Sequence, residues 1–255
     1  MGVILRYKDF IKTYKTRGYR IKHLENYKHL FPIKSSITLS GIVADLICDG
    51  NLQGDPKWRI DFTSKSIEEL KRFEKEIMSL FNVKCKIREC KSNLFGKTYN
   101  ISMNCSPIAR ILFLCGVPSG QKVLKNFDIP KWIKSDKKNF GRFAQRVFSC
   151  EGGIMFEKHR KMPQVRMEMW KSEALEKKEK FVKELGIYLK KHFGIISTIT
   201  KRKVYNVRKD GIITRPTKMY IHGENVKIFW KEIGFEGEKQ LKLNNILNNI
   251  FIPLP

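Results

Sequence analysis

The chain is short of acidic residues, and this deficit is its most informative absence. It has 25 Asp and Glu against 51 Lys and Arg among 255 residues, which leaves a formal net charge of +26 at pH 7. Such a surplus exceeds what solubility needs and opposes compaction through self-repulsion. A polyanionic partner explains it, so nucleic acid is the first interpretation and an anionic membrane surface the second.

Long apolar runs and paired cysteines are also missing. No stretch approaches the roughly 20 apolar residues that a membrane-spanning helix needs, and the opening MGVILRYKDF is too briefly apolar for a signal peptide. The six cysteines form no CxxC pair, so zinc is a poor interpretation and reduced, mostly buried thiols are the better one. We therefore expect an intracellular, cytoplasmic protein without a membrane segment.

What the chain does contain is an internal repeat. The segments IVADLICDG (42–50) and AQRVFSCEG (144–152) both end in Cys, an acid and Gly. Some way after each, a Lys-Ser pair opens an acidic stretch that we expect to be helical, from Lys65 and from Lys171. Apolar residues in the first stretch recur three and four apart, which is the helical period.

Hairpins and closing helices repeat in the same order. A short hairpin lies between each acid and its Lys-Ser pair, and a second hairpin follows the acidic helix. The second hairpin turns near 92–96 in the first half and at Asp210-Gly211 in the second, where Asp-Gly is a strong turn signal. Each half closes with a short helix and a similar tail, NFDIP or NIFIP.

Each half therefore has the predicted order αββαββα, and the fold class is α+β with a pseudo-two-fold duplication. We assign residues 1–36 to a basic N-terminal extension and 37–125 to the first half. Residues 126–140 are expected to form a linker, and 141–255 the second half.

The element order and the acid-Gly helix ends resemble the LAGLIDADG homing endonucleases in their single-chain, two-motif form. The resemblance covers about residues 37–255, and the segment NFDIPKWI resembles the linker of archaeal members. It implies two antiparallel sheets that form a DNA-binding saddle, with the two namesake helices side by side at its centre. A prokaryotic, archaeal-type protein that works as a monomer on double-stranded DNA is the corresponding expectation.

The resemblance also gives a role to the acid at each helix end. A carboxylate there opposes the helix dipole, which favours cations at the C-terminus. By resemblance, Asp49 and Glu151 meet at the bottom of the saddle and bind Mg²⁺ or Mn²⁺, together with the backbone carbonyls of Cys48 and Cys150. Two close carboxylates repel each other unless a cation lies between them, and hard oxygen ligands suit these metals. The alternative is a solvated acid beside a glycine in the left-handed backbone conformation.

Two lysines complete the predicted catalytic set. Lys65 and Lys171 each end the second strand of their half, and by resemblance they line the catalytic pocket, where they polarise water or stabilise phosphate charge. The alternative is a solvated surface lysine at a helix start. The sequence leaves both interpretations of Lys65 and Lys171 open.

Alternation along the strands predicts sheets with an apolar back and a basic front. In KWRIDF, for example, Lys57 and Arg59 oppose Trp58, Ile60 and Phe62. Basic and amide side chains on such a front can read base edges or contact phosphates. The predicted DNA-binding residues are Lys57, Arg59, Lys84, Lys86, Arg88, Gln164, Arg166, Lys201, Arg202, Lys203, Arg208 and Arg215.

One position departs from the family pattern. A small residue is usual at the third motif position, where two helices approach closely. Ala44 fits this pattern, but Arg146 does not. A long cation in a tight helix interface must be paired or turned outward. Because Asp45 lies next to Ala44 on the other motif helix, we predict an ion pair between Asp45 and Arg146.

Residues 1–36 lie outside the repeat and mix basic residues with tyrosines, among them Tyr7, Tyr14, Tyr19 and Tyr27. This pattern fits either a DNA-contacting arm or a small helical cap in which the tyrosines pack.

The resemblance implies a site-specific, divalent-metal-dependent DNA endonuclease that recognises a long duplex site. The alternative is a catalytically inactive nucleic-acid-binding protein of the same fold, either an RNA-splicing maturase or a DNA-binding regulator.

Overall fold

The computed structural model describes residues 2–14, 24–90, 96–156, 162–175, 180–201 and 203–251. Predictions that involve Tyr19, residues 92–95, residue 161 and Arg202 therefore lie outside the described residues. The chain divides into two compact units. The first consists of Met1–Gly120 with Pro130–Ile133, and the second of Gln121–Ile129 with Lys134–Pro255.

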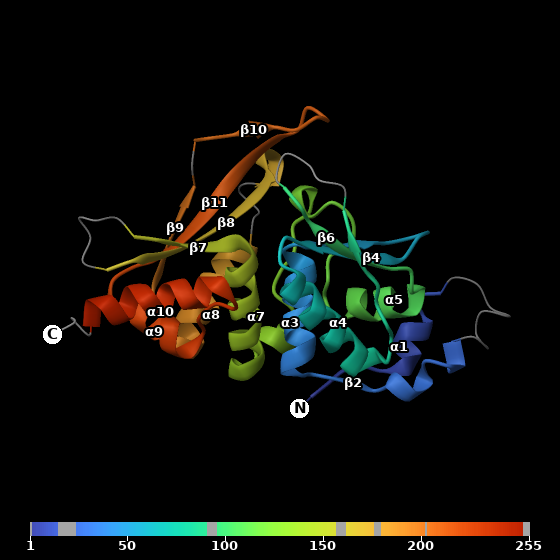
Figure 1. The fold of residues 1–255 in the computed structure, drawn as a ribbon. Helices are drawn as coiled ribbons and strands as arrows, with labels where there is room; N and C mark the ends of the chain where they lie inside the picture. Colours follow the sequence, from blue (N-terminus) through green and yellow to red (C-terminus); the bar gives the residue numbers. More distant parts are fainter. Residues whose placement is uncertain are drawn as a thin grey trace. The chain divides into compact units, whose positions relative to one another are not determined.

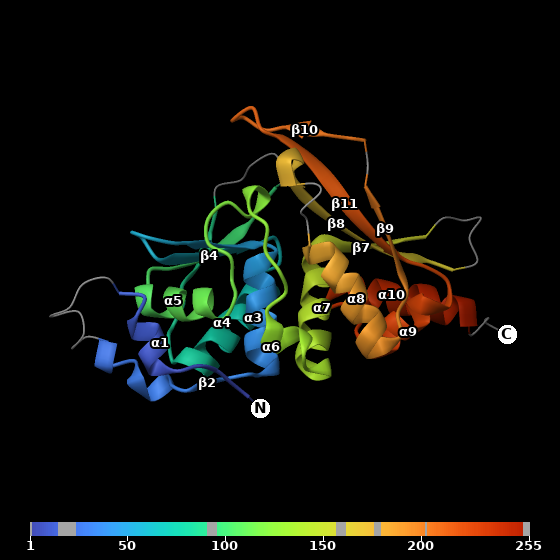
Figure 2. The same cartoon turned by 180° about the vertical axis from the view of Figure 1, so that it is seen from behind.

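The first unit has the predicted order of helix, hairpin, helix, hairpin and helix (Figures 1 and 2). Its four strands form an antiparallel sheet in the order β3-β4-β6-β5. The elements are α3 (Ile37–Ile47), β3 (Gly50–Gln53), β4 (Arg59–Ser64), α4 (Ile67–Phe81), β5 (Ile87–Glu89), β6 (Tyr99–Met103) and α5 (Ser106–Leu114).

Side-chain caps fix where the helices of this unit begin. The hydroxyl of Ser36 accepts a hydrogen bond from the backbone N–H of Leu39 at 3.1 Å, and Ser66 accepts one from the N–H of Glu69 at 3.4 Å. Both contacts satisfy N–H groups that have no partner inside a helix. Every residue from Leu39 to Ile47 is buried, so α3 is a core helix after its first two residues.

The core of the first unit lies between its sheet and its helices. The rings of Phe62 on β4 and Phe73 on α4 stack with their centroids 4.6 Å apart. Ile77 and Ile101 are fully buried with them. Burial of each such side chain contributes about 1.5–3 kcal/mol.

The second unit repeats this order with a longer second hairpin. Strand β11 pairs with both β9 and β10, and the sheet continues through β8 to β7, all antiparallel. The elements are α7 (Lys137–Glu151), β7 (Gly152–Met155), β8 (Gln164–Ser172), α8 (Phe181–Phe193), β9 (Ser197–Lys201), β10 (Asn206–Val207), β11 (Ile213–Ile221), α9 (Glu224–Glu232) and α10 (Glu238–Phe251).

One expectation for the second half was wrong in detail. The acidic stretch after Lys171 does not begin as an α-helix, because β8 continues to Ser172 through pairing with Thr214. A 3-10 turn (Glu173–Leu175) follows, and α8 begins only at Phe181.

The segment predicted as a linker, 126–140, contains helical residues. The short helix α6 (Lys131–Lys134) lies within it, and α7 begins there at Lys137. The carboxylate of Asp136 caps α7 by accepting a hydrogen bond from the N–H of Asn139 at 2.8 Å. The division between the two compact units runs through α6.

The described part of the N-terminal extension is a packed cap on the first unit. Strand β1 (Val3–Leu5) pairs with β2 (Ile33–Lys34), and η1 (Lys28–Leu30) precedes β2. Phe10 on α1 (Tyr7–Ile11) is fully buried, and its ring lies 5.5 Å from that of Tyr14. For the tyrosines that the structure describes, a packed cap is therefore a better interpretation than a DNA-contacting arm.

The guanidinium of Arg110 joins this cap to the repeat. It lies 4.2 Å from the ring centroid of Tyr14 and 4.1 Å from that of Trp58. Its Nη1 also donates to the carbonyl of Thr13 at 2.5 Å.

Among the described helices, none is both long enough and apolar enough to cross a membrane.

In each unit a glycine joins the acidic helix end to the first strand. A glycine is required there because the strand begins very close to the last turn of the helix. The expected left-handed conformation was wrong for Gly152, which has φ −100° and ψ 169°. A Cβ on Gly152 would lie 2.4 Å from the carbonyl oxygen of Phe148, and one on Gly50 would lie 2.7 Å from the Cα of Leu46. The strand therefore starts directly against the last helical turn, where no side chain fits.

We predict that Gly152→Ala destabilises the protein by about 1–3 kcal/mol, because the added methyl meets backbone that cannot move aside. Urea denaturation measures the change. Gly153→Ala is the matched control, since a Cβ there meets nothing within 4 Å. Equal stability of the two variants would contradict the close-approach explanation.

Candidate nucleic-acid interface and acidic helix ends

The two predicted acids occupy equivalent places in the two units. Asp49 follows the end of α3, is exposed, and immediately precedes β3. Glu151 is the last residue of α7, is half-buried, and immediately precedes β7. Both carboxylates therefore stand where a helix passes into the first strand of a sheet. Their placement at helix ends agrees with the sequence analysis.

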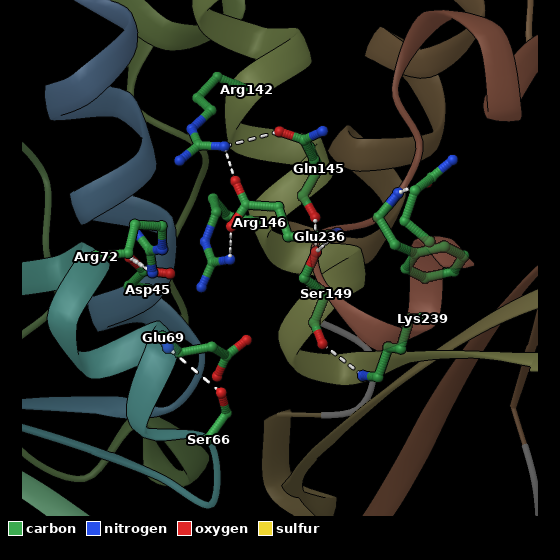
Figure 3. A network of polar contacts seen from close by, with 12 residues as sticks. Asp45, Ser66, Glu69, Arg72, Arg142, Gln145, Arg146, Ser149, Glu236 and Lys239 are labelled. Carbon is green, nitrogen blue, oxygen red and sulfur yellow. Dashed lines mark hydrogen bonds and ion pairs between the residues drawn. The ribbon is translucent and has the colours of Figure 1, made fainter. Parts of the chain in front are cut away.

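In the second unit a lysine lies against the acidic helix end. The ammonium of Lys239, at the start of α10, donates to the backbone carbonyl of Ser149 (Figure 3). It also donates to the carbonyl of Gly152 at 2.8 Å. These two carbonyls lie on either side of Cys150 and Glu151 in the chain. A cation here satisfies carbonyls that have no intrahelical partner and offsets the helix dipole. The ammonium of Lys239 therefore partly offsets the electrostatic penalty of placing Glu151 at the C-terminal end of α7.

Each of the two long motif helices carries a buried ion pair within its own unit (Figure 3). The carboxylate of Asp45 is fully buried and lies 2.7 Å from Arg72 on α4. In the second unit, the fully buried Arg146 pairs with Glu236 in the loop between α9 and α10. The predicted contact between Asp45 and Arg146 would join the two units and stays a prediction.

Further polar contacts fasten the loop after α9 to helix α7. Glu236 also pairs with Arg142, and its backbone N–H donates to the hydroxyl of Ser149 at 2.9 Å. The side-chain amide of Gln145 donates to the carbonyl of Ile233 at 3.0 Å. The buried cation at the third motif position is therefore part of a network internal to the second unit.

The two predicted catalytic lysines lie in different environments. Lys65 directly follows β4 and is exposed. Lys171 is only 4% exposed and lies within β8 on the same side as the core residues Val165, Met167 and Met169. Its ammonium donates to the carbonyls of Lys122 and Lys125 at 2.8 and 3.1 Å. It also lies 3.6 Å from the ring centroid of Phe127.

Lys171 thus anchors the segment before α6, and its contacts do not favour the predicted role in a catalytic pocket. The burial of Lys171 could have been predicted from the strand period, because positions 165, 167, 169 and 171 share one face of the strand. No comparable local pattern marks Lys239 or Glu236, whose partners are about 90 residues away in sequence.

The predicted alternation holds within β4, where Ile60 and Phe62 are buried and Arg59 is half-buried. Lys57 lies exposed in the turn before this strand, and the buried Trp58 lies outside the strand with a positive φ of 44°. The guanidinium of Arg59 is paired with Asp61 at 2.7 Å. Lys84, Lys86 and Arg88 are all exposed, although only Arg88 lies in a strand, because β5 is limited to Ile87–Glu89.

In the second sheet, several predicted DNA-binding residues already have partners. Arg208 binds Asp210 at 3.1 Å and Arg215 binds Glu173 at 2.7 Å. Gln164 is buried and Arg166 half-buried, whereas Lys201 and Lys203 are exposed. Ion pairs at partly exposed sites contribute only about 0–1 kcal/mol, so a phosphate group can replace the carboxylate.

The cysteines behave as packing residues. All six are free thiols. Burial raises the pKa of the Cys115 thiol to about 12. Burial, followed by the charges of Glu74 and Cys105, raises the pKa of Cys85 to about 11. Both thiols therefore stay protonated at neutral pH and are poor nucleophiles and metal ligands.

Within the ranges that the structure describes, no group of three His, Cys, Asp or Glu side chains gathers as a metal site. The donors at the helix ends are carboxylates and backbone carbonyls. These are hard oxygen ligands of the kind that suits Mg²⁺ or Mn²⁺ rather than zinc. The chemistry of the donor set therefore fits the predicted metal.

No protein-family model matches the chain. Among curated proteins, the tRNA-splicing ligase RtcB of Methanopyrus kandleri is 23% identical over 256 residues, which cover 92% of this chain and 24% of that protein. The chain therefore spans about a quarter of the length of this relative.

Two solved structures have a similar fold. The homing endonuclease I-WcaI, bound to its DNA recognition sequence, matches with a TM-score of 0.54 and 14% identity over 94% of this chain and 98% of that one. Full-length DUF199/WhiA from Thermatoga maritima matches with a TM-score of 0.52 and 14% identity over 91% of this chain and 67% of that one. The predicted α+β fold with antiparallel sheets, shared with LAGLIDADG homing endonucleases, is confirmed.

We predict that Lys171→Met lowers the free energy of unfolding by about 1–3 kcal/mol, because two carbonyls lose their buried donor. Lys65→Met, at an exposed site, should change it by less than about 0.5 kcal/mol. Chemical denaturation of both variants makes the comparison. A harmless Lys171→Met would show that its ammonium is not an anchor.

A second prediction concerns the buried pair in the second unit. Glu236→Gln should destabilise by about 3–5 kcal/mol, because Arg146 keeps its charge in a buried site. The double variant Arg146→Met with Glu236→Gln should lose less than the sum of the single losses. Glu89→Gln, which breaks the exposed pair with Lys97, is the control. Strict additivity in the cycle would argue against the pairing.

Proposed function

We propose that this protein is a site-specific DNA endonuclease that hydrolyses phosphodiester bonds in a long duplex target. The observation that carries the proposal is the repeated junction of helix, acid, glycine and strand in two units of one chain. The fold shared with the DNA-bound I-WcaI structure and the net charge of +26 support a duplex as the partner. A monomer suffices, because one chain holds both halves.

In this proposal, Asp49 and Glu151 bind Mg²⁺ or Mn²⁺ together with the carbonyl oxygens of Cys48 and Cys150. The bound metal would lower the pKa of water and stabilise charge on the phosphate oxygens. Lys65 is the basic residue that we retain for stabilising charge at the scissile phosphate. Lys171 is left out, because its ammonium is engaged by the Lys122 and Lys125 carbonyls.

The chain's own residues position the acids. Gly50 and Gly152 allow each strand to start against its helix, so each acid lies directly at the junction of helix and strand. Lys239 holds the backbone on either side of Glu151. The exposed residues Lys57, Lys84, Lys86 and Arg88 on the first unit and Lys201 and Lys203 on the second would bind the duplex.

A second candidate is a nucleic-acid-binding protein that does not cleave, such as a splicing maturase or a DNA-binding regulator. The departure at Arg146 and the burial of Lys171 favour it, because both remove expected features from the second half. The two candidates share the basic surface that binds nucleic acid, and the second does not cleave.

We predict that Asp49→Asn and Glu151→Gln each keep the fold and duplex binding but slow strand cleavage in Mg²⁺ by at least about 100-fold. Each change preserves shape and removes the charge. Cleavage of a random duplex library, followed by kinetics on the selected site, measures the effect. Glu224→Gln, at an exposed acid on α9, is the control.

Wild-type cleavage rates in both variants would show that the acids have no catalytic role. A wild-type protein that binds one duplex tightly but cuts none, with either metal, would favour the second candidate. Affinity that falls by orders of magnitude as salt rises is expected in both cases, because phosphate contacts release counterions.

A further inference from the structure

The first hairpin of the first unit ends in a tight turn that carries an exposed lysine. We call residues 54–58, between β3 and β4, the hairpin tip. The backbone N–H groups of Lys57 and Trp58 both donate to the carbonyl of Gly54 at 3.1 Å. Lys57 is exposed within this turn, so the shape of the hairpin tip determines where its ammonium lies.

Trp58 adopts a backbone conformation that is rare for a bulky residue. Its φ of 44° lies in the left-handed region, which a large side chain occupies only at a cost in free energy. Such strain persists where the surrounding structure holds the residue in place. The indole N–H of Trp58 donates to the carboxylate of Asp55 at 3.4 Å. Its ring contacts that of Phe113 on α5 edge-on, with the centroids 5.5 Å apart.

The guanidinium of Arg110 on α5 provides the remaining support for the hairpin tip. It lies over the ring of Trp58, 4.1 Å from the centroid, and over the ring of Tyr14 at 4.2 Å. One of its nitrogens, Nη2, also lies 4.0 Å from the carboxylate of Asp55. Arg110 is only 8% exposed, and cation–π contacts are strongest when the cation is withdrawn from water.

The same guanidinium connects the hairpin tip to the N-terminal cap. Nη1 donates to the carbonyl of Thr13, and Tyr14 is the next residue in the chain. Nε donates to the hydroxyl of Ser106, one turn earlier on α5, at 3.3 Å. Helices α1 and α5 lie side by side in both views (Figures 1 and 2). A planar group with several fixed donors can make these contacts together, whereas the single ammonium of a lysine cannot.

We infer that Arg110 is a positioning residue for duplex binding. It holds the hairpin tip in the conformation that presents Lys57 to a phosphate group, and the N-terminal cap holds Arg110 in place. Because Arg110 is itself buried, it acts through Lys57 and not through a phosphate contact of its own. The inference rests on the proposed duplex binding and is independent of cleavage. It gives the N-terminal cap, which lies outside the repeat, a role in binding.

The test measures the slope of log affinity against log salt for a duplex of random sequence, because this slope counts phosphate contacts whatever the bases are. Lys57→Met should lower the slope by about 0.9, the value for one phosphate contact. Arg110→Met and Arg110→Lys should each lower it by about the same amount, although both keep Lys57. The double variant Lys57→Met with Arg110→Met should have the slope of Lys57→Met alone, because the two residues serve one contact.

Two further variants separate positioning from a general loss of stability. Ile77→Val removes one methyl group from a fully buried side chain on α4 of the same unit. It should lower the urea midpoint and leave the slope unchanged. Tyr14→Leu keeps Arg110 and removes one of its two rings, so it tests the cap and replaces Arg110→Met if that variant does not fold. It should lower the slope in the same direction.

An unchanged slope in both Arg110 variants, with a lower slope in Lys57→Met, would overturn the inference and leave Arg110 with a packing role alone. A slope that falls in Arg110→Met but not in Arg110→Lys would also overturn it, because the charge would then contact phosphate directly. So would an unchanged slope in Lys57→Met, or an equal fall in Ile77→Val. If the wild-type protein binds no duplex at all, the proposed function itself fails, which distinguishes the two failures.

Discussion

The close approach of helix and strand at Gly50 and Gly152 is the constraint on which the arrangement of each unit depends. A side chain at either position would collide with the last helical turn, so a residue without a Cβ is required for the strand to start there. This geometry fixes the preceding acid at the helix end. The strand that starts at the glycine pairs at once with the second strand of its sheet, with Gly50 opposite Phe62 and Gly152 opposite Met167. The acid and the glycine are thus two consequences of one junction.

The motif helices of the two units bury side chains of opposite charge, although the two folds repeat. In the first unit, the motif helix buries a carboxylate, Asp45, and the adjacent helix supplies Arg72. In the second, the motif helix buries a cation, Arg146, and a loop supplies Glu236. A buried charge requires a partner whichever sign it has. The duplication has therefore preserved backbone order while the buried pairs have changed in sign and in position.

The sequence predicted the order of elements because helix and strand periods and turn residues are local signals. The alternation from Arg59 to Phe62 and the turn at Asp210-Gly211 are examples. It failed where a long-range contact decides the outcome. Pairing of Ser172 with Thr214 extends β8 beyond the point where the sequence suggested a helix. The ends of α3 and α7 could be located from their Cys-acid-Gly motifs, but the contact of Lys239 with the α7 end could not, because nothing near Lys239 in sequence marks it.

The contact between Lys171 and the carbonyls of Lys122 and Lys125 has a consequence for where the second unit begins. Together with the ring of Phe127, it ties strand β8 to the connection that precedes α6. A fragment that starts at residue 141 would leave a buried ammonium without its acceptors. A fragment that starts at Gln121 would retain them. The boundary that matters for dissecting, permuting or fusing this chain thus lies well before the helix that carries the second motif.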